Sequence, residues 1–360
     1  MGAVHPAANL AKTPPGRRYV NVFFDFEAPG NYDSGPFKGL SPPPTKPEDG
    51  PVPKLTVSKP KAKAAKPKTV LFERVAFIGI GLIGASMALA MRRAGLARSI
   101  VGCARRPKTR KTALSLGIVD KATADYADAV TGADLVVIAT PVGTIGMIAK
   151  AISAHLKPGA IVTDVGSVKQ AVVDAVAPYI PQGVHFVPAH PVAGTEHSGP
   201  EAGFAELFDR RWTILTPLAR TSPKATAKIA DMWRKMGANV ANMQPDHHDM
   251  VLAITSHLPH LIAYTIVGTA ADLGGDLKQE VIKYSASGFR DFTRIAASDP
   301  IMWRDIFLNN RDAVLEILQR FTEDLTAMQR VIRKADGKAL EESFMRTRAI
   351  RRGIIEAKQA

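Results

Sequence analysis

Residues 75–86 read VAFIGIGLIGAS, and the predicted architecture is built around them. The first half, Val75–Ile80, is a continuous apolar run rich in β-branched and aromatic residues, which is typical of a strand buried on both faces of a parallel sheet. The run ends in glycines, and Ile83–Ala94 then follows helical spacing. A buried strand, a glycine turn and a helix in this order predict the first unit of an α/β domain.

The glycines of this stretch, Gly79, Gly81 and Gly84, fit the pattern G-x-G-x-x-G between the strand and the helix. In that context the first glycine permits a tight turn, the second lets a pyrophosphate approach the backbone, and the third lets the helix pack against the strand. The N–H groups at the helix start, at Leu82 and Ile83, would bind the anion. The alternative is that the glycines serve only a tight turn.

The end of the second expected strand, Ser99–Cys103, indicates which dinucleotide binds. NAD-dependent proteins carry an acidic residue there, about 20 residues beyond the glycine motif, to bind the ribose 2′-hydroxyl. This chain has Ala104 followed by Arg105 and Arg106, whose guanidinium groups could hold a 2′-phosphate. We therefore expect NADP, with NAD possible; the alternative is that the arginines form a solvated loop and other contacts hold NAD.

Strands and helices continue to alternate after this unit. Strands are expected at residues 135–140, 160–164, 184–188 and 211–216, and helices at residues 107–116, 143–155 and 168–177. This alternation predicts a Rossmann-type, mostly parallel sheet with helices on both faces. Thr140 and Pro141, at a strand end, should lie along the same cofactor-binding edge.

The pattern changes to helices, with no convincing strand, from about residue 246. Apolar residues at 314, 318, 321, 325, 328 and 332 predict a long helix with one apolar seam. Residues 251–271 are apolar nearly all round, so we expect them to lie centrally in a helical domain. The predicted division is a Rossmann domain over residues 71–243 and a helical domain over residues 244–335, followed by a basic tail over residues 336–360.

Residues 1–70 hold 13 of the 26 prolines, 11 Lys/Arg and 5 Asp/Glu, so +6 of the net charge of +14 lies there. Such a segment buries too little apolar surface to offset its ordering entropy, and a disordered extension is expected. The other +8 is spread over the rest of the chain without the basic–aromatic interleaving that binds single strands. A small anionic ligand is therefore favoured over a nucleic acid.

Composition also bears on compartment and on metal sites. No uninterrupted apolar run reaches the roughly 18–20 residues of a membrane span, and the start lacks the apolar core of a signal peptide, so a cytoplasmic protein without membrane contact is expected. The single cysteine, Cys103, excludes an intrachain disulfide and a multi-cysteine metal site. We expect it to be a small buried apolar residue.

Polar segments follow several of the expected strands, where this fold places substrates. They are DVGSVK (164–169), HPVAGTE (190–196), SHLPH (256–260) and GFRDFTR (288–294). Taken singly, each has a structural explanation: Ser167 could cap a helix, His190 could be a hydrogen-bonded loop residue, and His257 and His260 could be core histidines or metal ligands. No carboxylate or cysteine completes a metal set, so no metal is expected.

Together with GLIGAS (81–86), these segments resemble the prephenate/arogenate dehydrogenase family, also called cyclohexadienyl dehydrogenases, from about residue 75 to 332. The resemblance implies a nicotinamide-dependent oxidative decarboxylation in tyrosine biosynthesis, from prephenate to 4-hydroxyphenylpyruvate or from arogenate to tyrosine. It also implies a homodimer formed through the helical domains, completed by the seam over residues 314–332.

The same resemblance assigns roles to individual residues. His190 would accept the proton of the substrate hydroxyl, Ser167 would bond that hydroxyl and orient the histidine, and Arg294 would hold the ring carboxylate. His260 would lie near the side-chain carboxylate of the substrate. The remaining pocket residues are Thr195, Glu196, His257 and Asp291, and Asp291 could also hold Arg294.

The alternative enzyme is another two-domain NADP-dependent dehydrogenase that acts on a β-hydroxyacid. Such enzymes share the loop and the helical domain. They have no reason to carry His190, Ser167 and Arg294 together.

Overall fold

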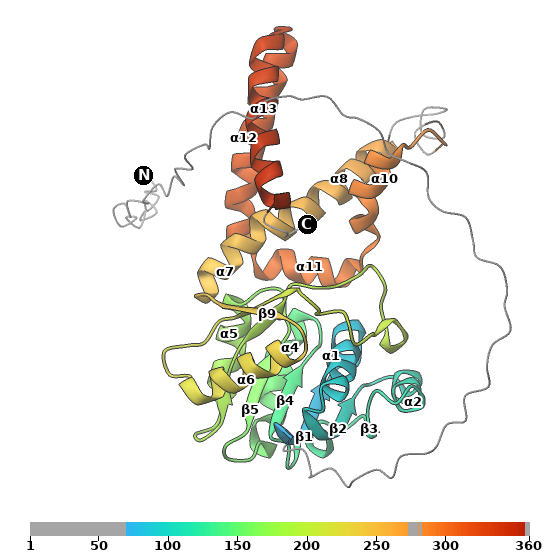
Figure 1. The fold of residues 1–360 in the computed structure, drawn as a ribbon, viewed down its shortest axis with the longest axis vertical. Helices are drawn as coiled ribbons and strands as arrows, with labels where there is room; N and C mark the ends of the chain where they lie inside the picture. The colour runs from blue at the N-terminus through green and yellow to red at the C-terminus, as the bar shows by residue number, and fades with distance from the viewer. Residues whose placement is uncertain (1–69, 273–279, 281–282, 357–360) are drawn as a thin grey trace, which may run out of the picture. The chain divides into compact units, whose positions relative to one another are not determined.

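The computed structural model describes residues 70–272, 280 and 283–356 (Figure 1). The extension expected over residues 1–70 lies outside the described residues, apart from Val70.

A six-stranded parallel sheet forms the centre of the first domain, in the order β3-β2-β1-β4-β5-β6. The strands are β1 (Phe72–Ile78), β2 (Ala97–Cys103), β3 (Lys121–Thr123), β4 (Leu135–Ile138), β5 (Ile161–Asp164) and β6 (His185–Phe186). The order reverses between β1 and β4, and in open α/β sheets ligands bind in the crevice beyond the strand ends at this point. The predicted Rossmann-type parallel sheet is confirmed.

Alternate residues of the central strands pack on opposite faces of this sheet. Val75 and Phe77 of β1 belong to one buried cluster, while Ala76 and Ile78 belong to another. The covering helices are α1 (Leu82–Arg93), α2 (Pro107–Ser115), α3 (Tyr126–Val130), α4 (Val142–Ile152), α5 (Gln170–Val176) and α6 (Pro223–Lys235). Burial on both faces explains why the strands read as continuous apolar runs. Three of these elements, β3, α3 and α6, were not predicted from the sequence.

A second, three-stranded sheet lies beyond β6. Its strands are β7 (Ala189–Pro191), β8 (Trp212–Leu215) and β9 (Asn239–Asn242), with β7 antiparallel to β8 and β8 parallel to β9. The strand expected over residues 184–188 is present as β6 but ends earlier: Val187 N–H still donates to Val162 of β5, whereas the Pro188 carbonyl accepts from Thr216 after β8. The chain passes from one sheet to the other at Pro188, so His190 lies in the second sheet.

The helical part begins directly after β9. It comprises α7 (Pro245–Leu252), a π-helical turn (Ala253–His257), α8 (Leu258–Asp272), α10 (Ser287–Thr293), a 3₁₀ turn (Arg294–Ala297), α11 (Pro300–Asn309), α12 (Arg311–Arg333) and α13 (Gly337–Glu356). α12 confirms the predicted seam helix. The segment expected to be a basic tail is instead largely the helix α13, which packs against α12. α11 packs against α4, and α7 against α5, so these helices connect the two domains (Figure 1).

The apolar segment over residues 251–271 was expected to lie centrally in the helical domain, but part of it is exposed in the single chain. Ile254 of the π-helical turn is 49% exposed, and Ile266 and Val267 of α8 are also exposed. The α12 seam is likewise uncovered in its second half, where Leu325 is 57% exposed. Helical periodicity records that a face is apolar but not what covers it. Within the described residues, Pro245–Asp272 is also the one helical segment long and apolar enough to cross a membrane by length and composition.

Candidate active site

The glycine loop lies between β1 and α1, at the carboxyl end of β1. Gly79 has a φ of +102°, and a Cβ there would lie 2.4 Å from the Ala139 carbonyl oxygen. A Cβ on Gly84 would lie 2.3 Å from the Gly79 carbonyl oxygen. Both residues must therefore be glycine for the loop to fold, because any side chain would collide with backbone.

Gly81 is different, because nothing within the chain requires a glycine there. Its φ of −88° suits any residue, and a Cβ would meet no atom within 4 Å. It is the N-cap of α1, where no side chain caps the helix and no acidic residue lies in the first turn. The N–H groups of Leu82 and Ile83 are thus available to an anion. An open space in front of uncapped N–H groups fits a pyrophosphate.

The end of β2 is cationic. Arg105 and Arg106 are exposed, form no ion pair with a described residue, and immediately precede α2. Arg110 donates from Nη1 to the carbonyls of Ala104 and Arg105, at 2.7 and 2.8 Å, and so holds this loop in place. Thr140 lies beside the glycine loop, with its Cγ2 3.0 Å from the position of a Cβ on Gly79. Pro141 then occupies the N-cap position of α4. The predicted cofactor-binding residues thus lie along one edge of the sheet.

A buried ion pair positions His190. Lys169 and Asp164, both fully buried, pair directly beyond β5. The Lys169 Nζ also donates to the Ala189 carbonyl at 2.9 Å, and Asp164 Oδ1 accepts the Ala189 N–H at 3.2 Å. Burial lowers the pKa of Lys169, opposed by Asp164. The pair clamps both backbone groups of Ala189, and so fixes the next residue, His190, against the end of the parallel sheet.

The His190 ring is buried and faces a second histidine from the helical domain. Its Nδ1 lies 2.9 Å from Nε2 of His248, and Nδ1 of His248 lies 2.8 Å from Oδ1 of Asp249. Burial holds the pKa of His190 well below 6.5, and the neighbouring His248 and Lys169 lower it further. His190 is therefore a neutral imidazole near neutral pH. Its Nε2 makes no hydrogen bond to a described residue, so this nitrogen is available to a ligand.

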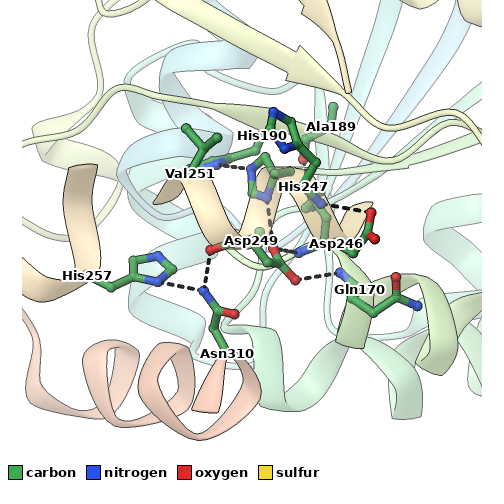
Figure 2. Close-up of polar contacts among 12 residues, drawn as sticks. Gln170, Ala189, His190, Asp246, His247, Asp249, Val251, His257 and Asn310 are labelled. Atoms are coloured by element: carbon green, nitrogen blue, oxygen red, sulfur yellow. Dashed lines mark hydrogen bonds and ion pairs between the residues drawn. The ribbon is translucent and has the colours of Figure 1, made fainter. Parts of the chain in front are cut away.

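Ser167 lies on the same loop as Lys169 and is half-buried. It makes no hydrogen bond to His190 within the described part of the chain, where the orienting partner is instead His248. It does not cap the following helix either: the N-cap of α5 is Lys169, and the carboxylate of Asp249 accepts the N–H groups of Lys169 and Gln170 (Figure 2).

His257 and His260 form one polar cluster with Trp303. His257 is fully buried, and its Nδ1 lies 3.0 Å from Nδ2 of Asn310, which also donates to the Asp249 carbonyl (Figure 2). Burial lowers the pKa of His257 to about 4. His260 stacks on Trp303 at 3.6 Å, and its Nδ1 donates to the Ser256 carbonyl. Within the described residues no group of histidines, cysteines and carboxylates could hold a metal.

Arg294 begins the 3₁₀ turn after α10, and its Nη1 donates to Oε2 of Glu196 at 2.9 Å. A backbone hydrogen bond is the largest cause that lowers the pKa of Glu196, and the Arg294 guanidinium lowers it further. Asp291 is exposed and makes no ion pair with Arg294, so the expectation that it holds this arginine is wrong. Thr195 accepts the His197 N–H at 3.2 Å and thereby shapes the loop that carries Glu196.

Several residues at this site were not predicted. Lys169 belongs to the segment GSVK but was given no role, and His248, Asp249 and Asn310 were overlooked. The run DHHD at residues 246–249, which opens the helical part with four titratable groups, is the signal that could have found two of them.

The geometry combines an edge suited to a dinucleotide with a neutral imidazole whose outer nitrogen is free, and a guanidinium on the helical side. Such a set can take a proton from a hydroxyl and bind a carboxylate.

Comparison with known proteins shows which family the chain resembles. The family described as "Prephenate dehydrogenase, nucleotide-binding domain" matches residues 87–242, and "Prephenate dehydrogenase, dimerization domain" matches residues 244–346. Cyclohexadienyl dehydrogenase of Zymomonas mobilis is 42% identical over 283 residues, which cover 78% of this chain and 96% of the relative. Prephenate dehydrogenase of Bacillus subtilis is 33% identical, over 78% of this chain and 76% of its own length.

Solved structures show the same relationship. Prephenate dehydrogenase from A. aeolicus, in complex with hydroxyphenyl propionate and NAD+, superposes with a TM-score of 0.73 at 36% identity, over 80% of this chain and all of that one. Synechocystis arogenate dehydrogenase gives a TM-score of 0.66 at 29% identity, over 77% of this chain and 98% of that one. In sequence, fold and the arrangement of its two domains, this chain belongs to the prephenate dehydrogenase family.

Proposed function

We propose that this protein catalyses the nicotinamide-dependent oxidative decarboxylation of prephenate, arogenate or both. The observation that carries the proposal is His190, a buried neutral imidazole held by the Asp164–Lys169 clamp with Nε2 free. Family membership supports it, because the relatives are named as prephenate, cyclohexadienyl and arogenate dehydrogenases. The β-hydroxyacid alternative has no comparable support.

The cofactor is a nicotinamide dinucleotide, held by the N–H groups of Leu82 and Ile83 and by the space in front of Gly81. When bound in its oxidised form, it supplies the acceptor for a hydride from C4 of the substrate ring.

The chain itself handles the proton and the carboxylates. His190 accepts the hydroxyl proton at Nε2 as the C4–O bond becomes a carbonyl. The electron pair of the bond between C1 and the ring carboxylate then moves into the ring, CO2 leaves, and the aromatic phenolate takes a proton back. Arg294 holds the ring carboxylate, and Ser167 bonds the hydroxyl.

NADP is the preferred cofactor in this proposal, because two guanidiniums directly follow β2 with no adjacent carboxylate, and neither forms an ion pair within the described part of the chain. Replacing both Arg105 and Arg106 by Ala should raise KM for NADP about tenfold or more and change KM for NAD less than about twofold, since charge-assisted bonds to a phosphate are lost. Steady-state kinetics with both cofactors measure this. Lys111→Ala, on the following helix, is the control. An NADP preference that survived the double substitution would place the phosphate elsewhere.

Arg294→Gln should raise KM for the substrate about 10- to 100-fold with a smaller effect on kcat, because a charge-assisted bond is worth about 1.5–3 kcal/mol. Glu196→Gln should leave KM unchanged or lower it, since the Glu196 carboxylate competes for the same guanidinium. Arg304→Gln is the matched control, because this arginine pairs with Asp305 instead. An Arg294→Gln enzyme with wild-type KM would remove the carboxylate role.

Two copies of the chain associate through the helical part in this proposal. The uncovered apolar side chains of α8 and α12 support it, as does the match of residues 244–346 to a dimerization domain. We do not propose that Pro245–Asp272 inserts into a lipid bilayer, because three of its polar residues, His248, Asp249 and His257, are buried and hydrogen-bonded within the protein. Sedimentation should give the mass of two chains; the mass of one chain would exclude the dimer.

The activity is tested with the purified chain, prephenate and arogenate, each with NAD and NADP. We expect one reduced cofactor and one CO2 per product, with 4-hydroxyphenylpyruvate or tyrosine identified by mass spectrometry. The absence of reduced cofactor with all four pairs would exclude the proposed activity.

A further inference from the structure

We propose that His248 and Asp249 are positioning residues that keep the His190 proton on Nδ1 and leave the lone pair on Nε2, facing the substrate. The inference rests on the proposed function, in which His190 is the proton acceptor. It concerns side chains on α7 of the helical part, 58 residues further along the chain than His190.

The direction of the hydrogen bonds follows from Asp249. Its Oδ1 accepts the Lys169 N–H at 2.7 Å, and its Oδ2 accepts the Gln170 N–H at 2.9 Å (Figure 2). Two donated N–H groups favour the ionised carboxylate, which can only accept. Nδ1 of His248, 2.8 Å from Oδ1, must therefore donate its proton to Asp249.

The tautomer of the second histidine then determines that of the first. A neutral His248 with its proton on Nδ1 has a lone pair on Nε2. That lone pair faces Nδ1 of His190 at 2.9 Å, so His190 Nδ1 carries a proton and donates it. Neutral His190 consequently has its lone pair on Nε2. The opposite tautomer would put two N–H groups, or two lone pairs, against each other inside the protein.

The two residues are held rigidly enough to impose this order. His248 is fully buried and Asp249 is 5% exposed. The Asp249 carboxylate caps α5 of the nucleotide-binding domain, and its backbone carbonyl accepts from Nδ2 of Asn310 at 2.8 Å. Asp249 of α7 thus reaches α5 through its side chain and the N-cap of α12 through its backbone, and the orientation of His190 depends on the contact between the two domains.

Among the charged groups around the two histidines, Asp249 is the one that favours their protonated form through a direct hydrogen bond. Burial lowers the pKa of His190, and His248, Lys169 and His257, which face it, each disfavour a positive charge on its ring. His248 faces Lys169, which lowers its pKa, and Asp249 and Asp164, which raise it against burial. When His190 takes the substrate proton at Nε2, its ring becomes positively charged. The Asp249 carboxylate stabilises that charge through the hydrogen bonds that join His190 to His248 and His248 to Asp249. Neutralising Asp249 should therefore weaken the base.

The first experiment compares variants of His248. His248→Gln keeps an oxygen acceptor near Nε2 and should retain most of the turnover. His248→Phe removes the acceptor and should lower kcat about 10- to 100-fold, the loss that is typical when the partner orienting a metal-bound histidine is removed. KM and the dinucleotide Kd should be unchanged in both. His247→Gln, on the exposed side of α7, is the matched control. Wild-type kcat in His248→Phe would overturn the proposal.

The second experiment uses pH as a readout that a purely structural role would not move. Asp249→Asn should lower kcat and shift the acid limb of kcat/KM to lower pH, because the negative charge that favours the protonated pair is gone. Asp246→Asn, three residues earlier on the same helix and exposed, should leave the limb in place. An unshifted limb in Asp249→Asn, or a shift to higher pH, would contradict the proposal.

Nitrogen-15 NMR of the wild-type protein reads the tautomer without any turnover. His190 should show a protonated Nδ1 and an unprotonated Nε2, and His248 should show the same pattern. A protonated Nε2 on His190 would overturn the inference even in an active enzyme. If the chain turned over neither prephenate nor arogenate while the NMR pattern held, the proposed function would fail and the positioning role would stand.

Discussion

His190→Asn should lower kcat about 10²- to 10⁴-fold, the usual contribution of a positioned general base. The asparagine side chain fits the space but cannot accept a proton at neutral pH. The dinucleotide Kd should stay within about twofold of the wild-type value, because the residues proposed to hold the cofactor follow β1, β2 and β4, whereas His190 lies on β7. Steady-state kinetics and a fluorescence titration of cofactor binding measure the two quantities.

The pH dependence of the wild-type enzyme belongs to the same prediction. The neutral imidazole is the active form, and burial puts the pKa of His190 below its ordinary 6.5. kcat/KM should therefore hold as pH falls through 6.5 and decline only at lower pH. His247→Asn is the control for the loss of a neighbouring histidine. Turnover that survived in His190→Asn would mean that another group accepts the proton.

Gly79→Ala and Gly81→Val should separate folding from cofactor binding within one loop. At Gly79 the added Cβ meets the Ala139 carbonyl oxygen at 2.4 Å in a left-handed conformation. The cost should be at least about 2 kcal/mol, which lowers Tm by several degrees. Thermal unfolding in the absence of cofactor measures it. An unchanged Tm would mean that the loop relaxes around the methyl group.

Gly81→Val should have the opposite signature. Nothing in the chain lies within 4 Å of the new Cβ and φ is −88°, so Tm should change by no more than about 1–2 °C. The valine would occupy the space proposed for the pyrophosphate, and the dinucleotide Kd should rise at least about tenfold. Wild-type affinity in Gly81→Val would mean that the pyrophosphate does not approach this residue.

The first domain was predictable because its signals are local. The apolar run of β1, the glycine turn and the helical spacing of α1 all fall within about 20 residues. A strand that is buried on both faces is also recognisable by itself, because nearly all of its residues are apolar. His190 and Arg294 could be singled out because they stand in recognisable segments. α12 could be predicted over its whole length from one apolar seam.

Contacts between distant residues could not be predicted in this way. His248 and His190 are 58 residues apart, and Asp249 and Lys169 are 80 apart, so nothing in either neighbourhood indicates the other. Asp291, three residues from Arg294 in the chain, was the expected partner of that arginine, whereas the fold brings Glu196 to it from 98 residues away. Short helices and strands, such as α3 and β3, were missed because they hold too few residues to show a period.

Residue order along the chain thus establishes a Rossmann-type domain with a dinucleotide loop and a set of candidate polar groups, because periodicity and turn chemistry act over short spans. Folding in three dimensions selects the members of that set that meet. It brings α7 against α5, so that Asp249 caps α5 and bonds His248, whose ring meets that of His190 on β7. It also leaves α8 with an exposed apolar face. The sequence could not predict this, because an apolar pattern shows that a helix face is apolar but not which part of the protein, or which partner, covers it.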